Sequence, residues 1–198
     1  YIRNKFRHEI RGMIMALYAI SDLHLALSTD KPMDIFGGHW VNHVEKIKKN
    51  WENKITEEDT VLIAGDISWS MKHEDSKMDL DWVNSLPGKK IISKGNHDYW
   101  WNSISKLNAM YDNTKFLQNN FYTYNDYAIC GTRGWLDPSS DKFNSKDAKI
   151  YAREQIRLRL SLDEAKKQGF DKFIVMIHYP PFGEENKESE LMKIFKEY

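Results

Sequence analysis

Short apolar runs alternate along the chain with segments that mix apolar and polar residues. Each run holds four or five residues, is rich in Val, Ile or aromatic residues, and in most cases borders on Gly, Asp or Asn, which is typical of buried strands. The runs are Ala16–Ile20, Val61–Ala64, Lys90–Ser93, Tyr127–Cys130 and Phe173–Ile177. Because helix-like segments separate several of them, the pattern predicts parallel βαβ units.

Three of the intervening segments have helical character. Along the first, apolar residues recur at steps of three or four, which is one face of a 3.6-residue period: Trp40, Val44, Ile47, Trp51 and Ile55. A second helix is expected over Ser76–Leu86. A third is expected from Asp147 to Gln168, where Gly169 supplies a favoured C-terminal cap.

The middle of the chain differs from this parallel pattern. Phe121–Tyr124 and Tyr127–Cys130 are joined by Asn125-Asp126, two residues that tolerate the left-handed backbone of a tight hairpin. A parallel core with an antiparallel portion means mixed sheets. The predicted fold class is therefore α/β.

Polar residues stand where the core strands end. Asp22 and His24 follow the first strand, two positions apart, so an extended backbone would point both side chains the same way. Gly65-Asp66, Gly95-Asn96-His97-Asp98 and His178 follow three later strands. In open α/β sheets, ligands bind beyond the carboxyl ends of the strands, where loops from separate strands converge. We therefore expect these side chains to meet.

This mixture of side chains suits a divalent metal ion. Carboxylate, amide oxygen and imidazole favour Mn²⁺, Fe or Zn²⁺, whereas a structural zinc site would require several cysteines. A carboxylate can also bridge two cations in a paired site for phosphoryl hydrolysis. Gly65 and Gly95 are expected to let the chain turn sharply. Any single motif alone is more often a turn or a helix cap, and only the four in order favour a metal site.

The order Asp22-Leu23-His24, Gly65-Asp66, Gly95-Asn96-His97-Asp98 and His178 resembles the calcineurin-like metallophosphoesterase superfamily. The match covers Ala16 to about Pro181. The resemblance implies two mixed β-sheets packed face to face and flanked by helices, a sandwich within the α/β class. It also implies two divalent metal ions, Mn²⁺ in first place and Fe or Zn²⁺ as alternatives.

The resemblance also implies a role for each matched residue. The implied metal ligands are Asp22, His24, Asp66, Asn96 and His178. The first two would bind one metal, the third would bridge, and the last two would bind the second metal. His97 would contact phosphate and protonate the leaving group, with Asp98 orienting it and Asn96 also near the substrate. The implied reaction is hydrolysis of a phosphate mono- or diester by a hydroxide that two metals activate.

The family's fifth block, Gly-His-x-His, does not occur after His178, and the sequence ends at Tyr198. We therefore expect residues 13–198 to be a single domain that is truncated at its C-terminus and lacks strands there. Weak metal binding, low activity and association through an open sheet edge are the expected consequences. Residues 1–12 are expected to be a leader or a non-native extension before a natural start at Met13 or Met15.

Composition narrows the class of partner. Lys and Arg together number 29, as do Asp and Glu, so the net charge is zero and no general attraction to nucleic acid or to an anionic membrane is implied. No apolar run approaches the length of a membrane span. Cys130 is the single cysteine, which suits a reducing compartment, and a cytoplasmic location is expected. The expected partner is a small phosphorylated substrate, and the oligomeric state is left open.

Several residues near the motifs have two interpretations. Arg133 could clamp substrate phosphate with its planar fork, or it could lie in an exposed turn. Four aromatic residues could stack on a nucleobase or line a pocket for an organic group, or they could belong to the core: Trp69, Tyr99, Trp100 and Trp101. For the whole chain, the alternatives to a phosphoesterase are a non-catalytic scaffold that retains the fold and a nuclease of the same superfamily.

Overall fold

The computed structural model describes residues 6–10, 13–183 and 187–198. The chain forms two compact units, the first ending at Phe116 and the second running from Leu117 to Tyr198. Each unit has its own hydrophobic core. The α/β class is confirmed, because each unit combines a sheet with helices. The predicted face-to-face packing of the sheets stays a prediction.

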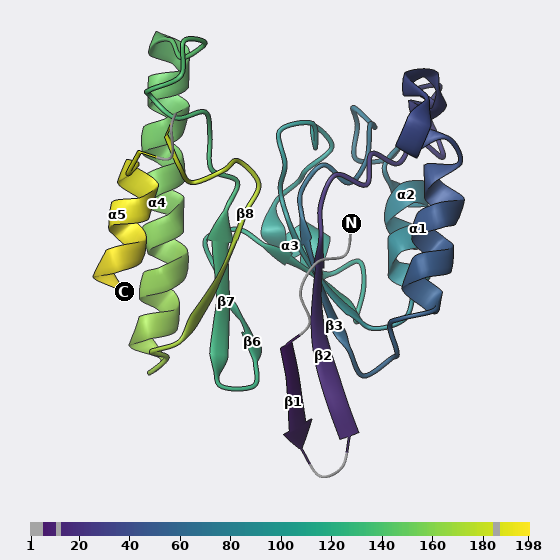
Figure 1. Ribbon diagram of the computed structural model, residues 1–198, viewed down its shortest axis with the longest axis horizontal. Coiled ribbons are helices and arrows are strands. Elements are labelled where there is room, and N and C mark those ends of the chain that lie inside the picture. The colour runs from purple at the N-terminus through teal and green to yellow at the C-terminus, as the bar shows by residue number, and fades with distance from the viewer. Residues whose placement is uncertain (1–5, 11–12, 184–186) are drawn as a thin grey trace. The chain divides into compact units, whose positions relative to one another are not determined.

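The sheet of the first unit has the strand order β1-β2-β3-β4-β5, of which Figure 1 labels β1, β2 and β3. β1 pairs antiparallel with β2, whereas β2, β3 and β4 run parallel, as the βαβ pattern predicts. The strands are β1 (Phe6–Ile10), β2 (Met13–Ile20), β3 (Thr60–Ala64), β4 (Lys89–Ser93) and β5 (Thr114–Leu117). Parallel pairing places the carboxyl ends of β2, β3 and β4 at the same edge of the sheet.

The α-helices of this unit contribute apolar side chains to its core. The described helices of the unit are the two 3₁₀ helices η1 (Met33–Phe36) and η2 (Gly38–Trp40), and the α-helices α1 (His43–Glu52), α2 (Lys77–Ser85) and α3 (Ile104–Asn108). Trp51 of α1 is fully buried in the core, together with Phe116 of β5. The first helix is shorter than predicted, because Asn42 adopts a left-handed backbone with φ of 54° and separates η2 from α1.

The sheet of the second unit has the order β6-β7-β8, with β6 (Tyr122–Tyr124), β7 (Tyr127–Thr132) and β8 (Phe173–Ile177). The predicted hairpin is confirmed, since β6 and β7 are antiparallel and Asn125 has a φ of 53°. β7 and β8 are parallel. The second unit therefore has the mixed sheet that the sequence predicts.

Two helices accompany the second sheet. α4 (Ser145–Lys167) packs on β7, and α5 (Glu190–Glu197) lies beside α4 (Figure 1). α4 begins at a capping box formed by Asn144 and Asp147, and Gly169 follows its C-terminal end with a φ of 91°, as expected for a cap. Among the described helices, none combines the length and apolar character that a membrane crossing requires.

The described elements that the sequence analysis did not predict include β1, η1, α3 and β5. β1 lies within the residues expected to be a leader or extension, and it extends the sheet beside β2. The expectation about the origin of residues 1–12 is untested, and residues 1–5 and 11–12 lie outside the described residues. Cys130 is buried on β7, and burial raises its pKa to about 11.

Substitution of Gly131 tests the close approach of β7 to β8. A Cβ atom at this position would lie 2.2 Å from the backbone oxygen of Met176. Gly131→Ala is therefore expected to lower the free energy of unfolding by about 3 kcal/mol, measured by urea denaturation. Gly169→Ala is the control, because its Cβ would meet nothing within 4 Å and only the left-handed φ costs about 1 kcal/mol. Equal losses in the two variants would contradict the described packing.

Candidate metal centre

The segments that follow β2 and β3 run side by side beyond the sheet. The amide of Asp22 donates to the carbonyl of Gly65 at 3.0 Å, and the amide of His24 donates to the carbonyl of Asp66, also at 3.0 Å. The next bond joins Leu25 to Ile67 at 2.8 Å. Backbone hydrogen bonds therefore bring the first two predicted motifs together within the first unit.

An imidazole and two carboxylates converge at these exits. His24 Nε2 lies 3.6 Å from Asp22 Oδ1 and 3.8 Å from Asp66 Oδ2. These separations are too long for hydrogen bonds but short enough for atoms that share one metal ion. Asp66 is 2% exposed and His24 is 9% exposed, whereas the Asp22 side chain is 46% exposed, so the centre is open to solvent on the side of Asp22. The donor set fits a divalent cation at this position.

The predicted reason for the pairing of Asp22 and His24 is wrong, although the two side chains do meet. Their backbones are left-handed rather than extended, with φ of 57° and 45°, and Asp66 has a φ of 54°. Residues other than glycine adopt this region at a cost, and residues strained in this way cluster at functional sites. The hydrogen bonds between the two exits hold all three residues in this conformation.

The exit of β4 packs directly on Asp66. The amide of His97 donates to Asp66 Oδ1 at 2.8 Å. A Cβ atom at Gly95 would lie 2.1 Å from Asp66 Oδ1 and 2.3 Å from the Asp66 nitrogen. Gly95 is therefore required for this close approach, whereas the sequence predicted that it serves a sharp turn. Asn96, between these residues, is partly buried.

Asp98 is a completely buried carboxylate at the centre of these loops. Its oxygen atoms accept hydrogen bonds from the backbone amides of Asp66 (2.8 Å), Gly95 (2.7 Å), Ile67 (2.8 Å) and Ser68 (3.4 Å), and from the indole of Trp100 (3.0 Å). Burial raises the pKa of Asp98, and the amide donors oppose that shift. These contacts join the exits of β3 and β4, and the predicted role of Asp98 in orienting His97 stays a prediction.

Trp69 packs against two of the predicted functional imidazoles. Its ring stacks on His24, with centroids 4.8 Å apart, and lies 4.6 Å from the ring of His97. Trp100, by contrast, is buried in the core, and Tyr99 is exposed. The sequence indicated only that Trp69 follows the Gly-Asp motif closely, which could not distinguish a support for the site from a core residue.

His178 follows β8 in the second unit. Its backbone amide and that of Tyr179 both donate to the carbonyl oxygen of Arg133, at 3.1 and 3.0 Å. These bonds tie the exit of β8 to the exit of β7. The predicted meeting of His178 with the ligands of the first unit stays a prediction.

Arg133 is held inside the second unit rather than in an exposed turn. Its side chain is 12% exposed and lies 3.3 Å from Glu154 Oε1, a carboxylate that also accepts from Thr132 at 2.7 Å and from Arg157 at 2.9 Å. The guanidinium lies over the ring of Trp135, 4.3 Å from its centroid. Burial lowers the pKa of Arg133, and Glu154 opposes that shift. A contact between Arg133 and phosphate stays a prediction.

Sequence comparison assigns the chain to a class. The model of the calcineurin-like phosphoesterase family matches residues 15–198, so the chain belongs to this family, which is metal-dependent. The chain is also 32% identical over 78 residues to the gene 66 protein of Mycobacterium phage L5, covering 39% of this chain and 37% of that protein. It thus spans little more than a third of this relative's length.

A solved structure is similar over most of the chain. It is a protein of unknown function from Aquifex aeolicus, with 20% identity, a TM-score of 0.42, and coverage of 84% of this chain and 81% of that one.

Removing the charge of Asp98 tests its role as the acceptor between the loops. Asp98→Asn replaces one acceptor oxygen by an amide donor that faces N–H groups, so at least two buried donors lose their partner. We expect the free energy of unfolding to fall by about 2–6 kcal/mol in urea denaturation, at about 1–3 kcal/mol for each of two unsatisfied groups. Asp112→Asn, at an exposed position of the same unit, should change little. A stable Asp98→Asn protein would contradict the assignment.

Trp69 provides a second test at this site. Trp69→Ala removes the ring that orders His24 and His97, so calorimetric titration should show Mn²⁺ binding about 10-fold weaker. Trp69→Phe retains an aromatic ring and should lose less. Trp82→Ala is the control, since Trp82 is a partly buried tryptophan that packs on the core from α2. If Trp82→Ala weakened Mn²⁺ binding as much as Trp69→Ala, a specific role for Trp69 would be excluded.

Proposed function

We propose that this chain hydrolyses a phosphate mono- or diester with the help of two divalent metal ions, with Mn²⁺ as the preferred ion. The observation that supports this most directly is the convergence of His24, Asp22 and Asp66 in a chain that belongs to the calcineurin-like phosphoesterase family. Asn96 and His178 complete the proposed ligand set. Bound divalent ions would neutralise charge on the phosphoryl oxygens and lower the pKa of water.

His97 is the proposed general acid. Its backbone amide is bonded to Asp66, and its ring packs on Trp69, so the imidazole is held beside the proposed ligands while remaining partly exposed. An imidazole can carry and release a proton near neutral pH, which suits protonation of the leaving oxygen. Asp98 acts as a positioning residue in this scheme, because it holds the loop that carries His97.

Asp66 is the proposed bridging ligand and the most informative position for a test. Asp66→Asn keeps an oxygen that can accept from the His97 amide but removes the negative charge. Mn²⁺ affinity, measured by calorimetry, should fall about 100-fold, and Mn²⁺-dependent hydrolysis of bis-p-nitrophenyl phosphate should fall about 1000-fold, since charge stabilisation is a large catalytic contribution.

Asp112→Asn serves as the matched control and should retain both properties. Measurable hydrolysis that is equal in the wild-type protein and in Asp66→Asn would refute the proposed site. Mn²⁺ binding without hydrolysis of either the mono- or the diester of p-nitrophenol would instead indicate a non-catalytic scaffold.

A further inference from the structure

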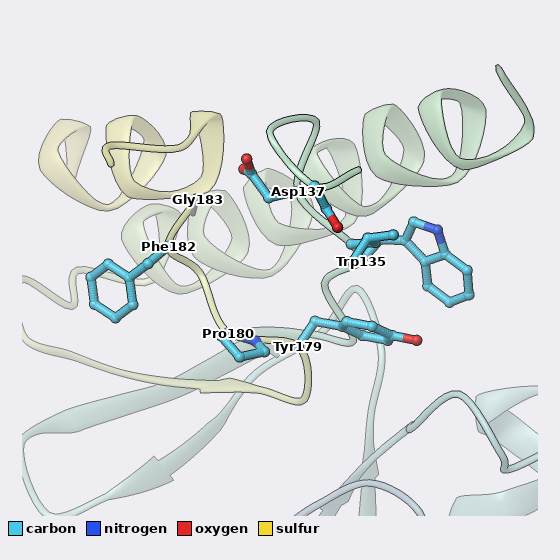
Figure 2. A pocket seen from close by; sticks show the side chains of 8 residues that line it. Trp135, Asp137, Tyr179, Pro180, Phe182 and Gly183 are labelled. Carbon is cyan, nitrogen blue, oxygen red and sulfur yellow. The ribbon is translucent and has the colours of Figure 1, made fainter. Parts of the chain in front are cut away.

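A pocket of about 210 Å³ lies in the second unit, between the segment that follows β7 and the segment that follows His178. Its wall includes Trp135, Asp137, Ser140, Tyr179 and Phe182. Figure 2 shows the rings of Trp135 and Tyr179 together on one side, Phe182 on the other side, and Asp137 between them. The pocket therefore combines aromatic surface with a carboxylate and a hydroxyl group.

This pocket adjoins the residues proposed to act in catalysis. Tyr179 directly follows His178, and their ring centroids are 5.5 Å apart. Tyr179 also packs on Trp135, at 5.0 Å between centroids, and Trp135 lies under the Arg133 guanidinium. Because one carbonyl oxygen, that of Arg133, accepts from both His178 and Tyr179, the pocket wall and the proposed ligand His178 are held together as one piece.

We propose that this pocket binds the nucleobase of a nucleotide substrate, an inference that rests on the proposed phosphoesterase function. Aromatic side chains bind bases by stacking, whereas a sugar alone offers no comparable flat surface. The volume is below that of pockets that enclose a whole drug-sized ligand. It accommodates one ring system, and the phosphate of the substrate would then lie outside the pocket, on the side of His178.

The polar groups favour a base over a simple phenyl ring. Asp137 Oδ1 accepts from the amide and hydroxyl of Ser139, and Oδ2 accepts from Tyr151 at 3.3 Å. A carboxylate has about four acceptor sites, so Oδ2 can accept one more N–H group. The Ser140 hydroxyl can donate. A nucleobase with an amino group can form hydrogen bonds with both, whereas a phenyl ring can form neither.

The test is a titration of the ¹⁵N-labelled full chain with guanosine 5′-monophosphate in EDTA, followed by NMR. The Trp135 indole signal, assigned by Trp135→Phe, should shift and saturate. Ribose 5-phosphate and phenyl phosphate should bind at least about 10-fold more weakly, because the first lacks the base and the second lacks its N–H groups.

Tyr179→Ala should weaken binding of the nucleotide about 10-fold, while Tyr179→Phe retains it because the ring is preserved. Tyr127→Ala, at a tyrosine of the same unit that is 39% exposed and does not line the pocket, should have no effect. Equal affinity for the three ligands, no shift below about 10 mM nucleotide, or an unaffected Tyr179→Ala protein would overturn the inference.

EDTA removes divalent metal ions, so nucleotide binding to the pocket can be measured separately from metal-dependent hydrolysis. Nucleotide binding at Trp135 in a protein that hydrolyses no phosphoester would support the pocket and refute the phosphoesterase. Hydrolysis that shows no dependence on Tyr179 and no preference for nucleotides would support the phosphoesterase function and refute the nucleobase pocket.

Discussion

The buried carboxylate of Asp98 is the interaction on which the geometry of the first unit's site depends. Its two oxygens accept from the amides of Asp66, Ile67 and Gly95, which belong to the exits of two neighbouring strands. An isolated buried charge is costly, and here directed N–H donors offset that cost. Since Asp66 has a left-handed backbone, which is unfavourable by itself, these bonds stabilise the conformation that aims its side chain toward His24.

The second unit uses the same physical principle with other residues. Glu154 is buried and accepts from Arg133, Arg157 and Thr132. Arg133 in turn offers its carbonyl oxygen to the amides of His178 and Tyr179. In both units a carboxylate outside the proposed ligand set fixes the backbone at a strand exit. Rigid exits matter because a metal ligand that is held in place loses little conformational freedom when the ion binds.

The sequence predicted the elements whose pattern is strong and missed those whose pattern is weak. Apolar runs ending in polar residues identified β3, β4 and β8, because strands in parallel pairs are largely apolar along their length, although β8 is only partly buried. α3 has five residues and β5 has four, too few for a period to be recognised. The length of α1 was overestimated, because the apolar period continues through Trp40 although the backbone at Asn42 interrupts the helix.

In the candidate site, too, the sequence identified some residues and missed the roles of others. Residue types and their order identified Asp22, His24 and Asp66 as candidate metal ligands, because ligand preference is a property of the side chain itself. The functions of Gly95, Trp69 and Asp98 could not be read in the same way, since they depend on distances between segments far apart in the sequence. A Gly95 Cβ would clash with Asp66, and only the folded chain shows that. A motif therefore predicts which ions a site can bind, whereas the residues packed around it determine how rigidly the ligands are held.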